Sequence, residues 1–247
     1  MATIGVFDSG VGGLSVLKEL RRLLPEERYV YYADTAFCPY GGKSADVVIG
    51  RSREITRFLQ SKGSNAIVVA CNTATGTAIE TLRTEFDLPF IGMEPAVKPA
   101  ALSTASGVVG VLATSLTLKS QKYLETKRRY ASNVKIVEHV GQGFVELVES
   151  AELDSPHARE VVSASLLPLI EAGADKIVLG CTHYPFLAGL MQEIAGPEVE
   201  IVNPAPAIAR RLKSLLPDSS GKGLDAGLEC YASGSREVLD RLVEIIF

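Results

Sequence analysis

Short apolar runs rich in Val and Ile alternate with longer segments of helical periodicity along the chain. This alternation is typical of βαβ units and of a mainly parallel sheet. Between the first two runs, leucines recur at helical spacing until Pro25 ends the pattern. The expected strands are 3–7, 29–33, 66–70, 89–92, 108–112, 134–139, 176–180 and 199–202. Helices are expected over 14–24, 45–62, 73–86, 158–172 and 207–216.

The chain also resembles itself. "AIVVACNTATG" aligns with "KIVLGCTHYPF", "LPFIGMEPAV" with "VEIVNPAPAI", and "IGVFDSG" with "VGVLATS". Val/Ile runs of parallel strands resemble each other by chance, but three matches in order at nearly constant offset favour a duplication. The matches pair Cys71 with Cys181, Ile91 with Ile201, and Ile4 with Val109.

Two similar α/β domains follow from this repeat, each with helices on both faces of a mainly parallel sheet, in three layers. We expect the first domain to comprise residues 1–96 plus 207–247, and the second to comprise 97–206. Ligands of such sheets bind at the carboxyl ends of the strands. If the two halves face each other, these strand ends share one site.

Composition excludes several classes of protein. The net charge is −4 and the few basic pairs have acidic neighbours, so no nucleic-acid partner is expected. The amino-terminal segment lacks the features of a signal peptide, and no apolar run is long enough to span a membrane. The cysteines form no CxxC pair, which favours free thiols in a reducing, cytoplasmic compartment.

Cys71 and Cys181 both stand at the end of a predicted strand. Each precedes a predicted helix, whose free N–H groups can bind an anion and favour a thiolate. A packed core thiol is the alternative for either residue, but an equivalent cysteine in each half favours function. Two thiols on opposite sides of a substrate can remove a proton from one face and return one to the other. The pair therefore predicts two-base racemisation.

Neighbouring polar residues extend this hypothesis. His183 can orient or deprotonate Cys181, and Asp8 can assist proton transfer or bind a substrate ammonium, although it can also cap the following helix. "FDSGVGGLS" has Ser15 where a dinucleotide fingerprint requires its third glycine, and "GGKS" has Phe37 where a Walker A motif requires its first. Neither nucleotide motif stands.

Together, "FDSGVGGLSVL", "ADTAFCPYGGKS", "VVACNTAT" and "VLGCTHYPFL" are similar in order and spacing to signature segments of the Asp/Glu racemase family, in particular its glutamate racemases. The resemblance covers nearly the whole chain. It implies two α/β domains related by a pseudo-twofold axis, with the active site in the cleft between them. It also implies a cofactor-independent isomerase that interconverts L- and D-glutamate for peptidoglycan, and a homodimer.

Residue roles follow from the same resemblance. Cys71 and Cys181 would be the alternating proton donor and acceptor, assisted by Asp8 and His183. Glu149 in "ELVES" is a further helper, although Glu146 lies one helical turn away in a loose motif. The substrate contacts carried over are Asp8, Ser9, Pro39, Tyr40, Gly41, Asn72, Thr73, Thr182 and His183.

One segment departs from the family. Where it more often has an Arg followed by a small aliphatic residue, this chain has Phe37 and Cys38. The extra thiol is open to oxidation, and it puts local substrate contacts and inhibitor sensitivity in doubt. No metal is expected, because the histidines are dispersed and CxxC is absent.

Other functions fit parts of the sequence. An aspartate racemase of the same fold stays open, as does an amino-acid binding module without turnover. A one-cysteine decarboxylase is disfavoured by the presence of both thiols. A cysteine hydrolase built on Cys181 and His183 leaves Cys71 without a role.

Overall fold

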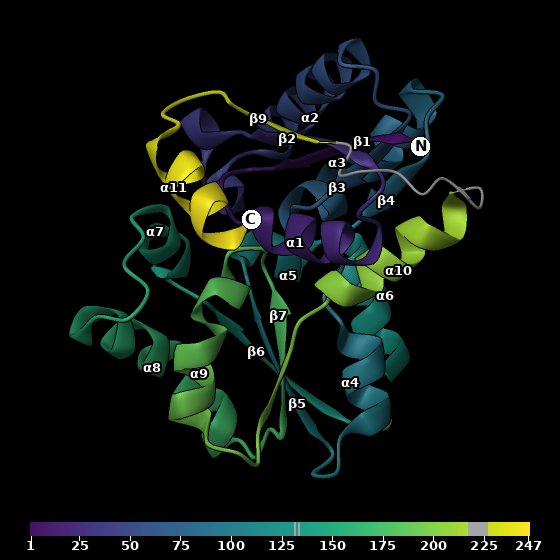
Figure 1. Ribbon diagram of the computed structural model, residues 1–247. Coiled ribbons are helices and arrows are strands. Elements are labelled where there is room, and N and C mark those ends of the chain that lie inside the picture. Colours follow the sequence, from purple (N-terminus) through teal and green to yellow (C-terminus); the bar gives the residue numbers. More distant parts are fainter. Residues whose placement is uncertain (131, 133, 217–226) are drawn as a thin grey trace. The chain divides into compact units, whose positions relative to one another are not determined.

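The computed structural model describes residues 1–130, 132, 134–216 and 227–247 (Figure 1). The chain forms two compact units. Unit 1 comprises Met1–Met93 and Ala205–Phe247, and unit 2 comprises Glu94–Pro204. Within the domain ranges expected from the sequence, residues 131, 133 and 217–226 lie outside the described residues. Each unit is an α/β structure built on a parallel sheet, as predicted.

Unit 1 has a five-stranded sheet in the order β4-β3-β1-β2-β9, with all neighbours parallel. Its strands are β1 (Thr3–Asp8), β2 (Arg28–Ala33), β3 (Ala66–Val69), β4 (Phe90–Gly92) and β9 (Leu228–Ala232). Helices α1 and α10 pack on one face and α2 and α3 on the other (Figure 1). The helices are α1 (Leu14–Leu23), α2 (Ala45–Ser61), α3 (Asn72–Glu85), α10 (Ala205–Leu215) and α11 (Glu237–Ile246), with 3-10 turns η1 (Thr35–Phe37) and η2 (Tyr40–Gly42).

Unit 2 has a four-stranded parallel sheet in the order β6-β5-β7-β8. Its strands are β5 (Val108–Ala113), β6 (Lys135–Val140), β7 (Lys176–Gly180) and β8 (Glu200–Val202). Helix α4 packs with α6, and α8 packs with α9. The helices are α4 (Val97–Ser103), α5 (Ser115–Lys119), α6 (Gln121–Tyr130), α7 (Phe144–Glu149), α8 (Pro156–Glu171) and α9 (Ala188–Ala195), with 3-10 turn η3 (Tyr184–Leu187).

Local sequence explains these elements. Strand β3 is buried throughout, as its run of Ala, Ile and Val requires. Helix α1 buries Leu14, Val16, Leu17 and Leu20 on one face and stops just before Pro25. Helix α2 begins after Ser44, whose side chain accepts a hydrogen bond from the Val47 amide. Among the described helices, none is both long and apolar enough to cross a membrane.

The internal repeat reappears in the sheets. The order 4-3-1-2 of unit 1 matches 8-7-5-6 of unit 2, and Ile4 pairs with Ala66 as Val109 pairs with Lys176. The duplication of these central strands is therefore present in their register as well as in their sequence.

A matching pair of glycines shows how closely the repeat is kept. A Cβ on Gly5 would lie 2.7 Å from Ile67 Cδ1 and 3.1 Å from Leu59 Cβ, and a Cβ on Gly110 would lie at the same distances from Ile177 Cδ1 and Leu169 Cβ. Both glycines are therefore needed for close packing of a helix against the sheet. The same contact has been kept in both units.

One predicted equivalence is wrong by a residue. Ile67 pairs with Phe90, whereas Ile177 pairs with Ile201, so Ile201 corresponds to Phe90 and not to Ile91. The stretch from Ile177 to its partner Ile201 is one residue longer than the stretch from Ile67 to its partner Phe90. Alignment of Val/Ile runs cannot detect such a slip, because neighbouring apolar residues look alike.

Candidate active site

Cys71 lies two residues beyond the end of β3 and is the N-cap of α3. Its buried sulfur accepts a hydrogen bond from the Ala74 amide at 3.4 Å, and its thiol donates to Ser9 Oγ at 3.8 Å. An amide donor at the positive end of a helix stabilises negative charge on the sulfur. The predicted helix N-terminus at this thiol is confirmed.

Asp8 is the last residue of β1 and is fully buried. Its carboxylate accepts a hydrogen bond from the Gly10 amide at 3.0 Å. The N-cap of α1 is Gly13, so Asp8 does not occupy the capping position. A Cβ on Gly13 would lie 2.6 Å from Asp8 Cβ and 2.8 Å from Tyr31 Oη. The glycine-rich turn thus packs closely against the carboxylate-bearing strand end.

Asn72 and Thr73 open helix α3 and are both buried. The Asn72 amide nitrogen donates to the Met93 carbonyl at 3.5 Å. Within the described part of the chain, Asn72 Oδ1 is a buried oxygen without a hydrogen-bond partner. Such an atom costs about 1–3 kcal/mol when it stays unpaired, and native proteins keep few of them. The oxygen is therefore a candidate ligand contact.

The "PYG" segment is held by a buried hydrogen-bond network. Tyr40 donates to Asp34 Oδ2 at 2.5 Å, and Arg51 donates to both oxygens of Asp34, at 2.9 Å and 2.8 Å. Burial, followed by the charge of Asp34, raises the pKa of Tyr40 far above its ordinary value. Pro39 and Gly41, which flank Tyr40, are exposed and half-buried respectively.

Sequence reasoning missed Asp34 and Arg51. A signal for Asp34 was present, because it directly follows β2 as Asp8 ends β1. Arg51 gave no comparable signal, since it lies in the middle of α2. Its guanidinium stacks 4.2 Å from the centroid of the Phe37 ring, so the residue that departs from the family pattern is part of the same network.

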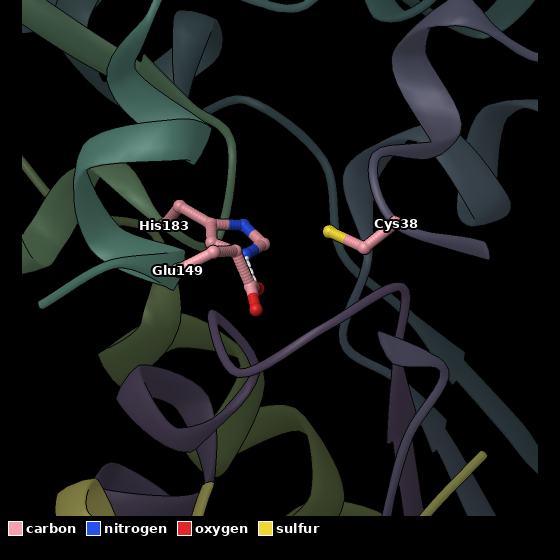
Figure 2. A group of neighbouring side chains, drawn as sticks. All are labelled: Cys38, Glu149 and His183. Atoms are coloured by element: carbon pink, nitrogen blue, oxygen red, sulfur yellow. Dashed lines mark hydrogen bonds and ion pairs between the residues drawn. The ribbon is translucent and has the colours of Figure 1, made fainter. Parts of the chain in front are cut away.

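In unit 2, Cys181 directly follows the end of β7 and is also buried. Its sulfur lies 3.8 Å from His183 Nδ1, and Thr182 Oγ1 lies 3.4 Å from the same nitrogen. His183 Nε2 lies 2.6 Å from Glu149 Oε1 (Figure 2). Thiol, imidazole and carboxylate therefore form a continuous chain. The structure brings Glu149 to the histidine, whereas Glu146 is exposed.

The helix predicted immediately after Cys181 is wrong. The 3-10 turn η3 begins at Tyr184, with His183 as its N-cap, and regular helix starts only at Ala188. Pro185, in the first turn, has no N–H to donate and a fixed φ. Cys181 therefore has an imidazole beside it instead of the helix amide found at Cys71.

The two sites differ in chemistry but share their position in the fold. Each thiol follows the strand that pairs with the first strand of its unit. Cys71 has an amide donor and a hydroxyl, and Cys181 has an imidazole backed by a carboxylate. The amide at Cys71 can stabilise a thiolate, and the imidazole at Cys181 can exchange a proton with its thiol.

Comparison with known proteins identifies a racemase family. The sequence profile described as "Asp/Glu/Hydantoin racemase" matches residues 4–212. A glutamate racemase of Herpetosiphon aurantiacus is 50% identical over 86% of this chain and 84% of its own.

Solved structures agree. A glutamate racemase of Escherichia coli, in complex with L-glutamate and an activator, has a TM-score of 0.87 at 35% identity and covers 99% of this chain and 95% of its own. One from Francisella tularensis, in complex with D-glutamate, has a TM-score of 0.83 at 27% identity, with coverage of 99% and 93%. The chain therefore belongs to the Asp/Glu/hydantoin racemase family, with glutamate racemases among its relatives, and is an isomerase.

Proposed function

We propose that the chain interconverts L- and D-glutamate by two-base proton transfer between Cys71, Cys181 and the substrate Cα, without a cofactor. The observation that carries the proposal is a thiol at the end of the equivalent strand in both halves of a duplicated fold. Related enzymes solved with L-glutamate and with D-glutamate support the choice of substrate.

The reaction balances with the groups available. One cysteine, as thiolate, accepts the Cα proton, and the electron pair left on Cα is delocalised into the adjacent carboxylate. The other cysteine, as thiol, delivers its proton to the opposite face of Cα. The enzyme is left with thiol and thiolate exchanged, ready for the reverse reaction. Because the Cα proton is a very weak acid, preorganised donors must stabilise the developing charge.

Buried polar groups of unit 1 suit the substrate's charged ends. Asp8 and Asn72 Oδ1 are acceptors, which match an α-ammonium. Ser9, Thr73 and the backbone amides of Tyr40 and Gly41 offer donors, which match carboxylates. In unit 2, the hydroxyl of Thr182 adds another donor. These assignments use the unpaired oxygen of Asn72, which no protein group satisfies among the described residues.

The His183–Glu149 pair gives Cys181 its own proton partner. Nδ1 faces the sulfur while Nε2 is held by the carboxylate. This order lets His183 accept the thiol proton while Glu149 orients the ring and stabilises the imidazolium, as a triad carboxylate does. We assign His183 and Glu149 to activation of Cys181, and the Ala74 amide to stabilisation of the Cys71 thiolate.

The wider role follows from the family. D-glutamate made by the enzyme would supply peptidoglycan synthesis in the cytoplasm, and the enzyme would act as a homodimer. Growth of a depleted strain only with added D-glutamate tests the first point, and sedimentation of the purified protein tests the second.

Racemisation assays test the proposed function. The purified chain, given L-glutamate or L-aspartate and followed by circular dichroism, should racemise glutamate with much the higher kcat/KM. Equal or greater activity on aspartate would overturn the choice of substrate. Binding of glutamate without loss of optical activity would show a binding module instead of an enzyme.

A further inference from the structure

We propose that Arg51 is a positioning residue for the substrate, acting through Asp34 and Tyr40 on the Pro39–Gly41 turn. The inference rests on the proposed function and deepens it. It names a residue that does not contact the substrate but on which substrate binding depends. It is carried by a closed set of contacts within unit 1, all on described residues.

Asp34 is the centre of the network. It is fully buried and accepts three hydrogen bonds, two from Arg51 and one from Tyr40. Its own amide donates to the Asp8 carbonyl at 3.0 Å. A carboxylate held by a bidentate guanidinium has a fixed orientation. Asp34 therefore joins the ends of β1 and β2 to the turn that carries Tyr40.

Tyr40 transmits this orientation toward the site. Its hydroxyl proton is committed to Asp34, and its ring is buried. Helix α3, which Cys71 caps, packs against the 3-10 turn η2 that carries Tyr40. Rotation of Tyr40 would shift the turn amides and the surroundings of Cys71 together.

Arg51 itself is held on several sides. Besides Asp34, it bonds Glu54, and its guanidinium stacks on Phe37. The hydrogen bond to Asp34 raises the pKa of Arg51 above its ordinary value, so it stays charged. A lysine can reproduce the charge but neither the bidentate fork nor the stacking. The geometry thus requires arginine at this position.

The test compares Arg51→Gln, Arg51→Lys and Arg51→Ala with a matched control, Arg53→Gln. Arg53 lies on the same helix and pairs with Glu85 at an exposed position. For Arg51→Gln, kcat/KM for glutamate should fall about ten- to hundredfold, the effect expected of a lost charge-assisted hydrogen bond. Most of the loss should be a rise in KM, since the turn contacts substrate before and during the reaction. Arg53→Gln should stay within about twofold of wild type.

Chemical rescue separates positioning from general stability. In Arg51→Ala, millimolar methylguanidinium should restore a measurable part of kcat/KM, because the space over Phe37 and beside Asp34 fits a free guanidinium. Arg51→Lys should fold and show an intermediate KM, and it serves as the test if the other variants do not fold. Rescue with no change in the melting temperature supports the proposal.

Three results would decide against it. The inference is overturned if Arg51→Gln has the same kinetic constants as Arg53→Gln. It is also overturned if Arg51→Lys keeps the wild-type KM. If methylguanidinium does not restore kcat/KM, and if the loss of kcat/KM parallels a fall in melting temperature, the role of Arg51 is only structural. Wild-type protein unable to racemise glutamate counts against the proposed function itself, whereas an active wild type with unaltered Arg51 variants counts against this inference alone.

Discussion

Units 1 and 2 have the same central topology but different surroundings for their cysteines. Both place a thiol after the strand equivalent to β3. In unit 1 the sulfur meets a helix amide, and in unit 2 it meets an imidazole. The backbone scaffold has thus been kept while the groups that act on each thiol have diverged. The proposed two-base racemisation would account for this difference, since each thiol would act on a different face of a chiral substrate.

Removing either thiol should have the largest effect. Cys71→Ser and Cys181→Ser should each lower racemisation by about a thousandfold or more, because a serine hydroxyl is a far weaker acid than a thiol and is not ionised at neutral pH. Polarimetry measures the activity, and far-UV circular dichroism checks that the fold is kept. Near-wild-type turnover in either variant would mean that one unit acts alone.

Substitutions in the His183–Glu149 pair beside Cys181 should have the next largest effect. His183→Asn should lower kcat about a hundredfold, the usual contribution of a general base, and Glu149→Gln should lower it about tenfold through one weakened charge-assisted hydrogen bond. The matched control is Glu146→Gln, on the exposed face of α7. If Glu149→Gln and Glu146→Gln give the same rates, the carboxylate plays no part in activating Cys181.

The shared scaffold can be tested at its equivalent glycines. Gly5→Ala and Gly110→Ala should each reduce the free energy of unfolding by about 1–3 kcal/mol, because each Cβ overlaps an Ile and a Leu. Gly50→Ala in α2 and Gly189→Ala in α9 are controls, since a Cβ there meets nothing within 4 Å. Urea unfolding measures all four. A loss of stability in only one of the two glycine variants would contradict equivalent packing in the two units.

The smallest effect concerns a position where the units differ in charge. Asp175 accepts hydrogen bonds from Thr104, Ala105 and Ser106; burial opposes its ionisation, but these bonds outweigh it and lower its pKa to about 2. The equivalent Asn65 accepts one, from the Thr3 amide at 2.9 Å. Replacing the Asp175 carboxylate with a neutral amide should therefore lower the stability of unit 2, by an amount that depends on pH.

Because the folded pKa of Asp175 is depressed, its contribution is complete above the unfolded pKa near 4 and is lost as the pH falls toward 2. Asp175→Asn should cost about 1 kcal/mol at pH 6, after allowance for solvent screening. Urea unfolding should show that the difference in free energy of unfolding between wild type and Asp175→Asn is smaller at pH 2.5 than at pH 6. For Asn65→Ala this difference should not depend on pH. A pH-independent difference for Asp175→Asn would refute the stabilising role of the ionised carboxylate.

The central strands could be predicted from the sequence to within a residue or two, because buried parallel strands require runs of β-branched residues. Strand β9 was missed, since it is only half-buried and its sequence has no such run, and helix α11 was missed although its apolar residues have helical spacing. The turn after Cys181 was mistaken for a helix because periodicity does not show how Pro185 alters the first turn.

Part of the site could also be predicted. The paired thiols follow from strand ends and the repeat, and the structure brings the predicted Glu149 into contact with His183. The Arg51–Asp34 pair could not be found, because it joins a strand end to the middle of a helix. Tertiary packing decides which arginine of α2 faces Asp34. The sequence of α2 alone does not distinguish that arginine from its neighbours.

Isotope exchange tests the two-base claim most directly. In D2O, L-glutamate converted by the enzyme should give D-glutamate carrying deuterium at Cα, while L-glutamate recovered early should carry almost none. The reaction started from D-glutamate should show the mirror result. Under the proposed two-base mechanism each thiol serves one face, so the abstracted proton returns to its own substrate before exchange. Deuterium appearing equally fast in recovered substrate and in product would contradict two separate bases and indicate a single base that serves both faces.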